Sequence, residues 1–279
     1  MPIYDLSYRH WSGEWTSHPY RWWVITRQGI RLLAQKKRFL FLMILAALPF
    51  VVRAVMLYFA TVLGRSGIIT VDARFFEQFL TQQSFFVFII AIYAGAGLIA
   101  NDLKVNALQI YLSKPITRRD YMIGKLGVVT FFLGVVTLLP AVLLFLLAVV
   151  FETDGKFLEQ YYWALGAIVA YSFAIVLTNA LLVLALSSLT KSSRFAGINF
   201  AAIFFFSQIL YGILGGILRT SRVAWVALGN NLELVGNLIF GTEPRYQSPA
   251  WLSLAILAAL AAASALVVHR RVQAVEVVR

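Results

Sequence analysis

The chain has 279 residues, of which 61% are hydrophobic and 13% charged, and its formal net charge is +12. Soluble domains carry about twice that share of charged residues, and a compact fold of this size could not hide so much apolar surface from water. The composition excludes an ordinary soluble protein and favours one that is solvated by lipid. Because the chain has no cysteine, disulfides, cysteine–zinc sites and cysteine nucleophiles are excluded as well.

The first 38 residues do not form a secretory signal, because no apolar core precedes a small-residue cleavage site. Residues 20–37 (YRWWVITRQGIRLLAQKK) place Trp23, Ile30 and Leu33 near one helical face, with the basic side chains elsewhere. Tryptophan at the headgroup level and cations near phosphate are typical of a helix that lies in the membrane interface. We expect an amphipathic interfacial helix here; a plain juxtamembrane linker is the alternative.

Six segments are apolar over a length that can cross the membrane, since a helix needs about 20 residues to cross about 30 Å of hydrocarbon. The fourth segment is long enough to tilt, and for the short second segment a start near Phe79 is an alternative. The predicted fold class is therefore an all-α membrane protein with one transmembrane domain over residues 1–279. The predicted spans are 39–63, 84–100, 126–151, 161–189, 195–218 and 249–268.

Lysine and arginine are distributed unequally between the two sides of these spans. Residues 1–38 contain seven, residues 101–125 contain five, and the fourth connection and the C-terminal tail add two and three, whereas the opposite side has six. Cytoplasmic connections carry the excess of positive charge. We therefore expect a multi-pass protein of the bacterial cytoplasmic (inner) membrane with both termini in the cytoplasm. The net charge is explained by topology and anionic lipid rather than by nucleic acid.

The longest connection on the outer side is residues 219–248. Its apolar piece, residues 223–240, is interrupted by glycine, asparagine and Glu233, so that a full span is excluded. We expect a short re-entrant segment or a helical hairpin at the outer surface.

Motifs for catalysis and energy capture are absent from the sequence. Gly124-Lys125 is followed by Leu126, so it lacks the hydroxyl residue of a phosphate-binding loop, and no zinc-protease or serine-hydrolase motif occurs. The three histidines lie far apart in the sequence, and we predict no metal site. The predicted spans are nearly free of acids, whereas self-powered transporters need ionisable groups in the membrane. Energy is therefore expected to come from a partner protein.

Arg53 is the one charge inside a predicted span. Its guanidinium could rise to the interface on its flexible stem, or it could contact an anionic substrate between two copies of the chain. Pro49 and Pro140, in the first and third spans, are predicted to bend their helices to accommodate packing.

The connection between the second and third spans is the most informative part of the sequence. Residues 97–125 read GLIANDLKVNALQIYLSKPITRRDYMIGK. The span ends at Asn101-Asp102, a short helix follows, Pro115 ends it, and Thr117 can cap the next helix with Asp120 in its first turn. The sequence predicts a helix–break–helix held close to the membrane; an inert structured loop is the alternative.

This connection resembles the membrane subunits of type-2 ATP-binding-cassette (ABC) transporters, in which a run like G-L-I-A-x-D…G-A-L…L-S-x-P-I-x-R-x-x-Y-x-x-G-K joins spans two and three. Asn106 stands where glycine is common in that family, and the tail 267–279 (VVHRRVQAVEVVR) also resembles the family's ending. The matching residues are Gly97, Leu98, Ile99, Ala100, Asp102, Ala107, Leu108, Leu112, Ser113, Pro115, Ile116, Arg118, Tyr121, Gly124 and Lys125.

The resemblance implies a permease that is not itself an enzyme and that binds no cofactor. Two permease copies, identical or paired homologues, would form the path for the substrate, and two separate ATPase subunits would bind ATP and magnesium. The loop between spans two and three would form a coupling helix on the ATPase. The residues that the resemblance assigns to coupling are Asn101, Asp102, Leu103, Lys104, Ala107, Leu108, Tyr111, Leu112, Pro115 and Arg118.

The apolar, aromatic-rich spans favour a lipidic or amphipathic substrate, and the resemblance alone implies that its direction is export. A structural membrane anchor that uses the same fold without transport is the second hypothesis. An intramembrane enzyme is the third, and it lacks candidate acids, bases and metal ligands in the predicted spans.

Overall fold

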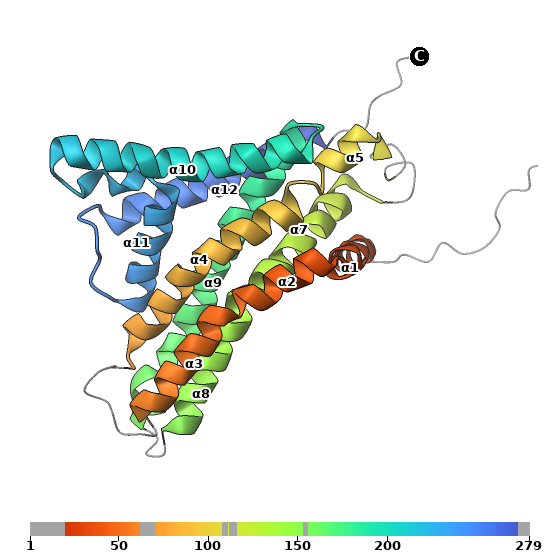
Figure 1. The fold of residues 1–279 in the computed structure, drawn as a ribbon. Coiled ribbons are helices and arrows are strands. Elements are labelled where there is room, and N and C mark those ends of the chain that lie inside the picture. Colours follow the sequence, from red (N-terminus) through yellow and green to blue (C-terminus); the bar gives the residue numbers. More distant parts are fainter. Residues whose placement is uncertain (1–19, 62–70, 108–110, 112–115, 153–155, 273–279) are drawn as a thin grey trace, which may run out of the picture.

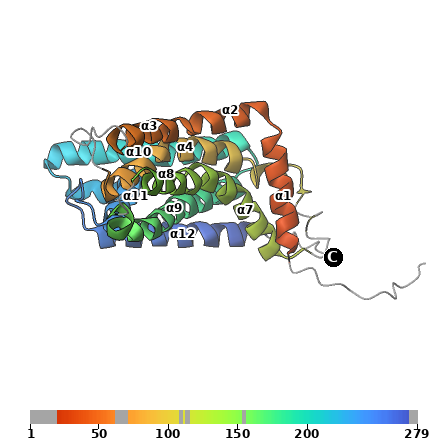
Figure 2. The same cartoon turned by 90° about the horizontal axis from the view of Figure 1, so that it is seen from below.

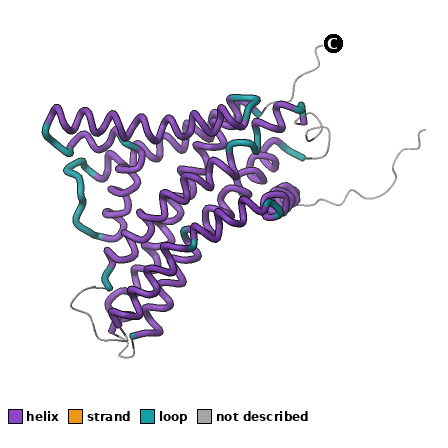
Figure 3. The backbone as a smooth tube through the Cα atoms, in the orientation of Figure 1, coloured by secondary structure: helices purple, strands orange, loops and turns teal. Residues whose placement is uncertain are grey.

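The computed structural model describes residues 20–61, 71–107, 111, 116–152 and 156–272, and within these ranges every regular element is a helix (Figure 3). Six helical segments of this part of the chain are long and apolar enough to cross a membrane. The predicted fold class, an all-α protein with six membrane-length helices, is confirmed. The helices are α1 (Arg21–Ala34), α2 (Lys37–Ala46), α3 (Leu48–Thr61), α4 (Ala73–Gly95), α5 (Ala100–Lys104), α7 (Arg118–Val136), α8 (Leu138–Phe151), α9 (Lys156–Leu189), α10 (Ser193–Leu218), η1 (Arg222–Val226), α11 (Leu228–Phe240) and α12 (Ala250–Arg271).

The long helices lie close together at one end of the bundle and diverge toward the other, with α4 and α9 in the middle (Figures 1 and 2). α1, α5 and the C-terminal end of α12 lie at the first end, which we call the α5 end. At the other end α11 packs against α4, α9 and α12; we call this the α11 end. The two ends carry different kinds of polar groups.

Two of the six spans are bent at their prolines, as predicted. α2 and α3 form one span that breaks at Ala47, before Pro49, and α7 and α8 form another that breaks at Thr137, before Pro140. Proline cannot donate a hydrogen bond to the carbonyl four residues earlier, so each bend leaves carbonyl oxygens without their helical partner.

One side chain of α4 meets both bends. The Gln83 amide nitrogen donates to the carbonyl oxygens of Ala46, at 2.7 Å, and Val136, at 2.8 Å. Val136 is the residue whose carbonyl Pro140 would otherwise have bonded. Gln83 is fully buried, so its amide replaces hydrogen bonds that water could not supply in a membrane.

The second span is longer than the sequence indicated. α4 begins at Ala73, where the Asp72 side chain accepts a hydrogen bond from the backbone N–H of Phe75, rather than near residue 84 or 79. The additional turns include Glu77, which is 5% exposed. The expectation that Arg53 is the one charge within the spans is therefore wrong, since a buried carboxylate lies in the second one.

α1 runs across the ends of the long helices rather than along them (Figure 2). Its inner face, with Ile25, Gly29 and Leu33 four residues apart, rests on α7. Trp23 is 48% exposed, so it does not share the buried side with Leu33. The helix is present as predicted, and its amphipathic pattern buries one apolar side in the protein and leaves others exposed.

Large apolar surfaces face outward from α2, α3 and α10. The most apolar stretch of α10 has no buried residue, and Phe205, Phe206 and Ile217 are more than half exposed. Surfaces of this kind are stable only against lipid tails or another protein.

The segment between α10 and α12 holds one α-helix after a 3-10 turn, not a hairpin at the surface. α11 is buried along most of its length, including Asn230, Asn231 and Asn237. Asn231 supports its start by donating to the carbonyls of Trp225 and Ala227, and Gly241, with φ of +62°, ends it. The asparagines that interrupted the apolar pattern are therefore placed inside the protein.

Candidate functional site

The α4–α5 junction is attached to α9 by one buried hydroxyl. The Ser187 oxygen accepts hydrogen bonds from the backbone N–H groups of Ile99 and Ala100, at 3.1 and 3.0 Å, and donates to the carbonyl of Ala96, at 2.8 Å. These backbone groups lie in the turn where α4 ends and α5 starts, so they lack regular helical partners. Ser187 therefore fixes the direction of α5 relative to α9.

Asp102 of α5 faces inward, toward α7. Its carboxylate accepts a hydrogen bond from the Tyr121 hydroxyl and pairs with the Lys125 ammonium, each at 2.7 Å. The side chains of Lys125 and Asp102 are only 10% and 17% exposed. The Tyr111 ring lies 5.5 Å from that of Tyr121, and the Lys125 ammonium lies over both rings. We call these four residues the Asp102 cluster.

The charge state of the Asp102 cluster follows from its burial. Burial, and after it the charge of Asp102, raise the pKa of the Tyr111 hydroxyl above its ordinary value. Tyr111 is therefore a neutral phenol at physiological pH. An aspartate–lysine pair enclosed by two aromatic rings is a structural cross-link between α5 and α7, because little water reaches it.

The loop that follows α5 explains two further residues of the sequence pattern. Asn106 adopts a left-handed backbone with φ of +54°, which glycine adopts without strain and asparagine better than most other residues. Asparagine where the related proteins have glycine therefore preserves the turn. Thr117 caps α7, and Asp120 bonds back to it in a capping box, as the sequence predicted in part.

The residues assigned to coupling have different environments. Asn101, Lys104 and Arg118 are exposed; Leu103, Ala107 and Tyr111 are half-buried; and Asp102 belongs to the buried cluster. Leu108, Leu112 and Pro115 lie outside the described residues. Val105, which the resemblance did not assign, is 68% exposed and adjoins Lys104. The outer surface of this segment is thus carried by residues 101 and 104–106.

α1 is held against α7 by close backbone contact. A Cβ on Gly124 would lie 2.7 Å from the Cβ of Ile25 and 2.9 Å from the carbonyl oxygen of Trp22, so no larger residue fits. The Thr26 hydroxyl donates to the carbonyl of Gly124 at 3.0 Å. The Y-x-x-G-K run therefore joins three elements: Tyr121 and Lys125 bind α5, and Gly124 gives α1 its place.

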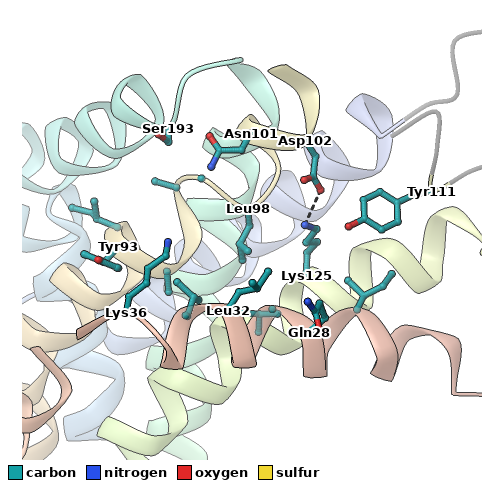
Figure 4. A pocket seen from close by; sticks show the side chains of 18 of the residues that line it. Gln28, Leu32, Lys36, Tyr93, Leu98, Asn101, Asp102, Tyr111, Lys125 and Ser193 are labelled. Atoms are coloured by element: carbon teal, nitrogen blue, oxygen red, sulfur yellow. Dashed lines mark ion pairs between the residues drawn. The ribbon is translucent and has the colours of Figure 1, made fainter. Parts of the chain in front are cut away.

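A cavity of about 700 Å³ lies beneath α5, between α1, α4 and α7 (Figure 4). Its floor is apolar, with Leu32 and Leu98, and the Asp102–Lys125 pair lies along one side. Lys36 extends into it near the Tyr93 ring, 5.9 Å away. The cavity leaves space between α1 and the α4–α5 junction, which are otherwise linked through α7.

At the α11 end lies a cavity of about 590 Å³ bounded by α3, α4, α11 and the loop after α11. The guanidinium of Arg53 lies there, 4.9 Å from the centre of the Phe75 ring. Arg53 therefore extends along the protein's own cavity. The lining residues are Arg53, Arg74, Glu77, Gln78, Thr81, Gln82, Glu233, Asn237, Glu243, Pro244 and Arg245.

A second cavity of about 260 Å³ adjoins the first, and Thr81 and Glu233 line both. It lies between α4, α9, α10 and α11, and its wall includes Tyr171, Asn179 and Asn230. We call the two cavities together the polar chamber. Among the described residues, no three acidic or histidine side chains are placed to hold a metal ion.

Comparison with known protein families identifies the class of this protein. A family model described as ABC-2 family transporter protein matches residues 23–267. The chain therefore belongs to the ABC-2 transporter family, as the resemblance of residues 97–125 indicated. It is a multi-pass permease subunit of an ABC transporter, the membrane component that pairs with an ABC ATPase and not the ATPase itself. No curated protein gave a significant match to the chain.

Several polar residues of these sites were not singled out from the sequence. Ser187, Asn179, Thr81 and Gln83 lie in short polar runs within apolar segments, namely Ser187-Ser188, Thr178-Asn179 and residues 81–84. A polar side chain within a membrane span is unfavourable unless it has a hydrogen-bond partner, and this is the signal that could have identified these residues. Which partner it has depends on the packing of helices far apart in the sequence.

Proposed function

We propose that this chain is the permease of an exporter in the bacterial cytoplasmic membrane, with the α5 end in the cytoplasm. Two copies, or one copy and a homologue, form the transport path, and two ATPase subunits bind ATP and magnesium beneath them. The cargo is lipidic or amphipathic, because the outward surfaces of the spans are apolar and aromatic.

The distribution of charge supports this orientation. Exposed basic residues of the α5 end include Lys37, Arg38, Lys104, Arg194 and Arg270. Lysine and arginine near span ends favour the cytoplasmic side. α1 then lies at the level of the lipid headgroups, with the exposed Trp23 and its cations toward the membrane surface.

The observation that carries the proposed coupling is that α5 is exposed on one side and attached on the other. Lys104 and Val105 face away from the bundle. Ser187 ties the start of α5 to α9, and Asp102 ties its middle to α7. A force that an ATPase applies to the exposed side therefore reaches α4, α7 and α9 together, and it reaches α1 through Gly124.

The apolar faces of α10 and of α2–α3 support a paired permease. They are the least buried of the membrane-length helices, and a second copy would cover one of them while lipid covers the other.

Two experiments test this function. The first is co-expression with candidate ABC ATPases followed by purification, in which we expect an ATPase to remain bound. The second is Lys104→Glu in the purified complex. Since Lys104 lies on the proposed contact, we expect cargo-stimulated ATP turnover to fall about tenfold or more.

The matched control is Arg222→Glu, the same reversal of an exposed charge at the α11 end. It should leave ATP turnover unchanged. A permease that transports cargo without any ATPase, or an equal effect of the two reversals, would show that the proposal is wrong.

A further inference from the structure

The polar chamber is lined by charges of both signs. Arg53, Arg74 and Arg245 face Glu77, Glu233 and Glu243 across it, and in the part of the chain that the structure describes none of these six forms an ion pair. Glu77 is buried and Arg53 and Glu233 are half-buried, whereas Arg74, Glu243 and Arg245 are exposed. A charge that is removed from water and forms no ion pair is costly.

Each of the three arginines has its own neutral support. The Arg53 guanidinium lies over the Phe75 ring, that of Arg245 lies 5.7 Å from the Tyr246 ring, and Arg74 donates to the backbone carbonyl of Glu243 at 3.4 Å. The charges are therefore positioned without being paired to one another.

Glu77, the most buried of the charged groups, is positioned by a short chain of hydrogen bonds. The Thr81 hydroxyl donates to the Glu77 carboxylate at 3.1 Å and lies 3.2 Å from the Tyr171 hydroxyl. Tyr171 is itself fully buried. This arrangement fixes the carboxylate in the wall of the chamber. Among the described residues it forms no ion pair, although the charges of Arg74 and Arg53 act on it.

Buried amides of the chamber wall provide a second, independent observation. The Asn179 side-chain oxygen and the Asn230 side-chain nitrogen line the smaller cavity and have no hydrogen-bond partner, although these residues are only 2% and 3% exposed. The Asn237 side-chain oxygen lines the larger cavity and is unpartnered too, at 6% exposure. Buried amides are nearly always hydrogen-bonded, so unpartnered ones beside a cavity indicate a ligand or water that supplies the bonds.

From these observations we propose that the polar chamber binds a zwitterionic group, an ammonium and an anionic oxygen group on one ligand. The ammonium pairs with Glu77 and Glu233, and the anionic oxygens take the fork of donors of Arg53 and Arg245. Asn179 accepts from the ligand and Asn230 donates to it. The two cavities have the size of small-molecule sites, which measure about 300–1,000 Å³.

This inference deepens the proposed function, because it names the polar part of the amphipathic cargo. The same chemistry occurs in the headgroup of a zwitterionic phospholipid and in a free peptide. The proposal concerns the shared chemistry, and the experiment tells the two sources apart.

Binding is measured by saturation-transfer NMR on the purified permease in nanodiscs of an uncharged glycolipid, without any ATPase. The zwitterionic probes are glycerophosphoethanolamine and dialanine. The single-charge probes are glycerophosphoglycerol, ethanolamine, N-acetyl-dialanine and dialanine amide. We expect at least one zwitterion to bind about tenfold more tightly than either of its single-charge counterparts. Tighter binding of the phosphoethanolamine probe indicates a lipid headgroup, and tighter binding of dialanine a peptide.

Two variants and two matched controls test where the ligand binds. Glu233→Gln and Arg245→Gln each remove one charge from the chamber and should weaken binding of the zwitterion about tenfold. Glu159→Gln and Arg222→Gln make the same changes at exposed positions outside the chamber and should leave the affinity for the zwitterion unchanged. Neither chamber side chain is fully buried, and unchanged melting temperatures verify that the variants fold.

The proposal is overturned if neither zwitterion binds, or if the single-charge probes bind as tightly as the zwitterions. It is also overturned if the chamber variants and the control variants bind the zwitterion equally tightly. These outcomes are separate from a failure of the proposed function. If the permease binds the zwitterion but never retains an ATPase, the proposed function is wrong and the proposed binding site stands. If it retains an ATPase but binds no zwitterion, only the proposed binding site is wrong.

Discussion

The two ends of the bundle use polar side chains in opposite ways. At the α5 end, Asp102 is paired with Lys125 and bonded to Tyr121, and Ser187 both donates and accepts, so the polar groups bond one another. At the α11 end, charges of both signs face a common cavity, and the Asn179 side-chain oxygen and the Asn230 side-chain nitrogen in the adjoining cavity lack partners. Satisfied groups hold helices together, whereas unsatisfied groups are available to a ligand. This difference is what the two proposals rest on, a mechanical role for the α5 end and a binding role for the α11 end.

The largest effect is expected from breaking the ion pair of the Asp102 cluster. Asp102→Ala leaves the Lys125 ammonium buried without its carboxylate, which should cost about 3 kcal/mol of stability. Thermal or denaturant unfolding of the purified protein measures it. Lys104→Ala, on the exposed side of the same helix, is the control and should cost almost nothing. If the two variants unfold alike, the cluster is not the cross-link described above.

The second prediction concerns how α11 reaches its place beside α9. A Cβ on Gly236 would lie 2.6 Å from the Tyr171 ring, so Gly236→Ala should displace α11 and cost about 2 kcal/mol. Because Tyr171 also lies beside Thr81, binding in the polar chamber should weaken too.

Gly229, on the same helix, provides the control. A Cβ there meets nothing within 4 Å, so Gly229→Ala should be neutral or stabilise the helix by up to about 1 kcal/mol. Unfolding measurements that rank the two alanine variants in the reverse order would contradict the packing.

A third prediction tests Gln83, which belongs to neither end. Gln83→Leu removes two hydrogen bonds to the bent spans and should cost about 1–2 kcal/mol, since such bonds in membrane proteins contribute about 0.6–1 kcal/mol each. Gln82→Leu, the exposed neighbour, should be close to neutral. Equal stabilities would mean that the prolines bend their spans without this support.

The smallest effect is a dependence on pH at the α11 end. Burial raises the pKa of the Glu233 carboxyl above its ordinary value, while Arg245 and then Tyr246 oppose the shift. A raised folded-state pKa contributes stability at low pH that is lost as the pH rises through it. Glu77, from α4, faces this carboxyl, and the two carboxylates repel each other when both are ionised.

Stability should therefore decline slightly as the pH rises above the ordinary range of a glutamate, and the Glu233→Gln variant should not show this decline. Binding of the zwitterion should change in the opposite direction, because the ammonium needs the ionised carboxylate. Over a series of pH values from mildly acidic to neutral, the melting temperature measures the stability and ligand NMR measures the binding of the zwitterion. A wild-type protein whose stability rises over that range would contradict the assignment.

The fold was predictable where a pattern is local. Apolar length defines the spans, Pro49 and Pro140 mark the bends, and Thr117 with Asp120 marks the start of α7. The early start of α4 was missed because Glu77 interrupts its apolar run, and a carboxylate inside a span is unexpected until the cavity beside it is known.

The sites were predictable only in part. The pattern of residues 97–125 indicated the segment that the resemblance assigns to coupling, but it did not tell which side of α5 is exposed. Asp102 bonds Tyr121 and Lys125, which the sequence did not indicate because a short helix shows too few turns for a periodicity. Its role at a contact with the ATPase stays a prediction. The polar chamber depends on Arg53, Glu77, Asn179 and Glu233, which come from four helices, and no local pattern brings these residues together.

The bonds of Gln83 also limit how the protein can change shape. The first and third spans each bend at a proline, and both bends are fastened to one amide group on the second span. If either bend opens while the other stays fixed, one of these bonds must break where no water can replace it. The motions of the two bends are therefore coupled. A conformational change that preserves both hydrogen bonds has to move the first three spans together.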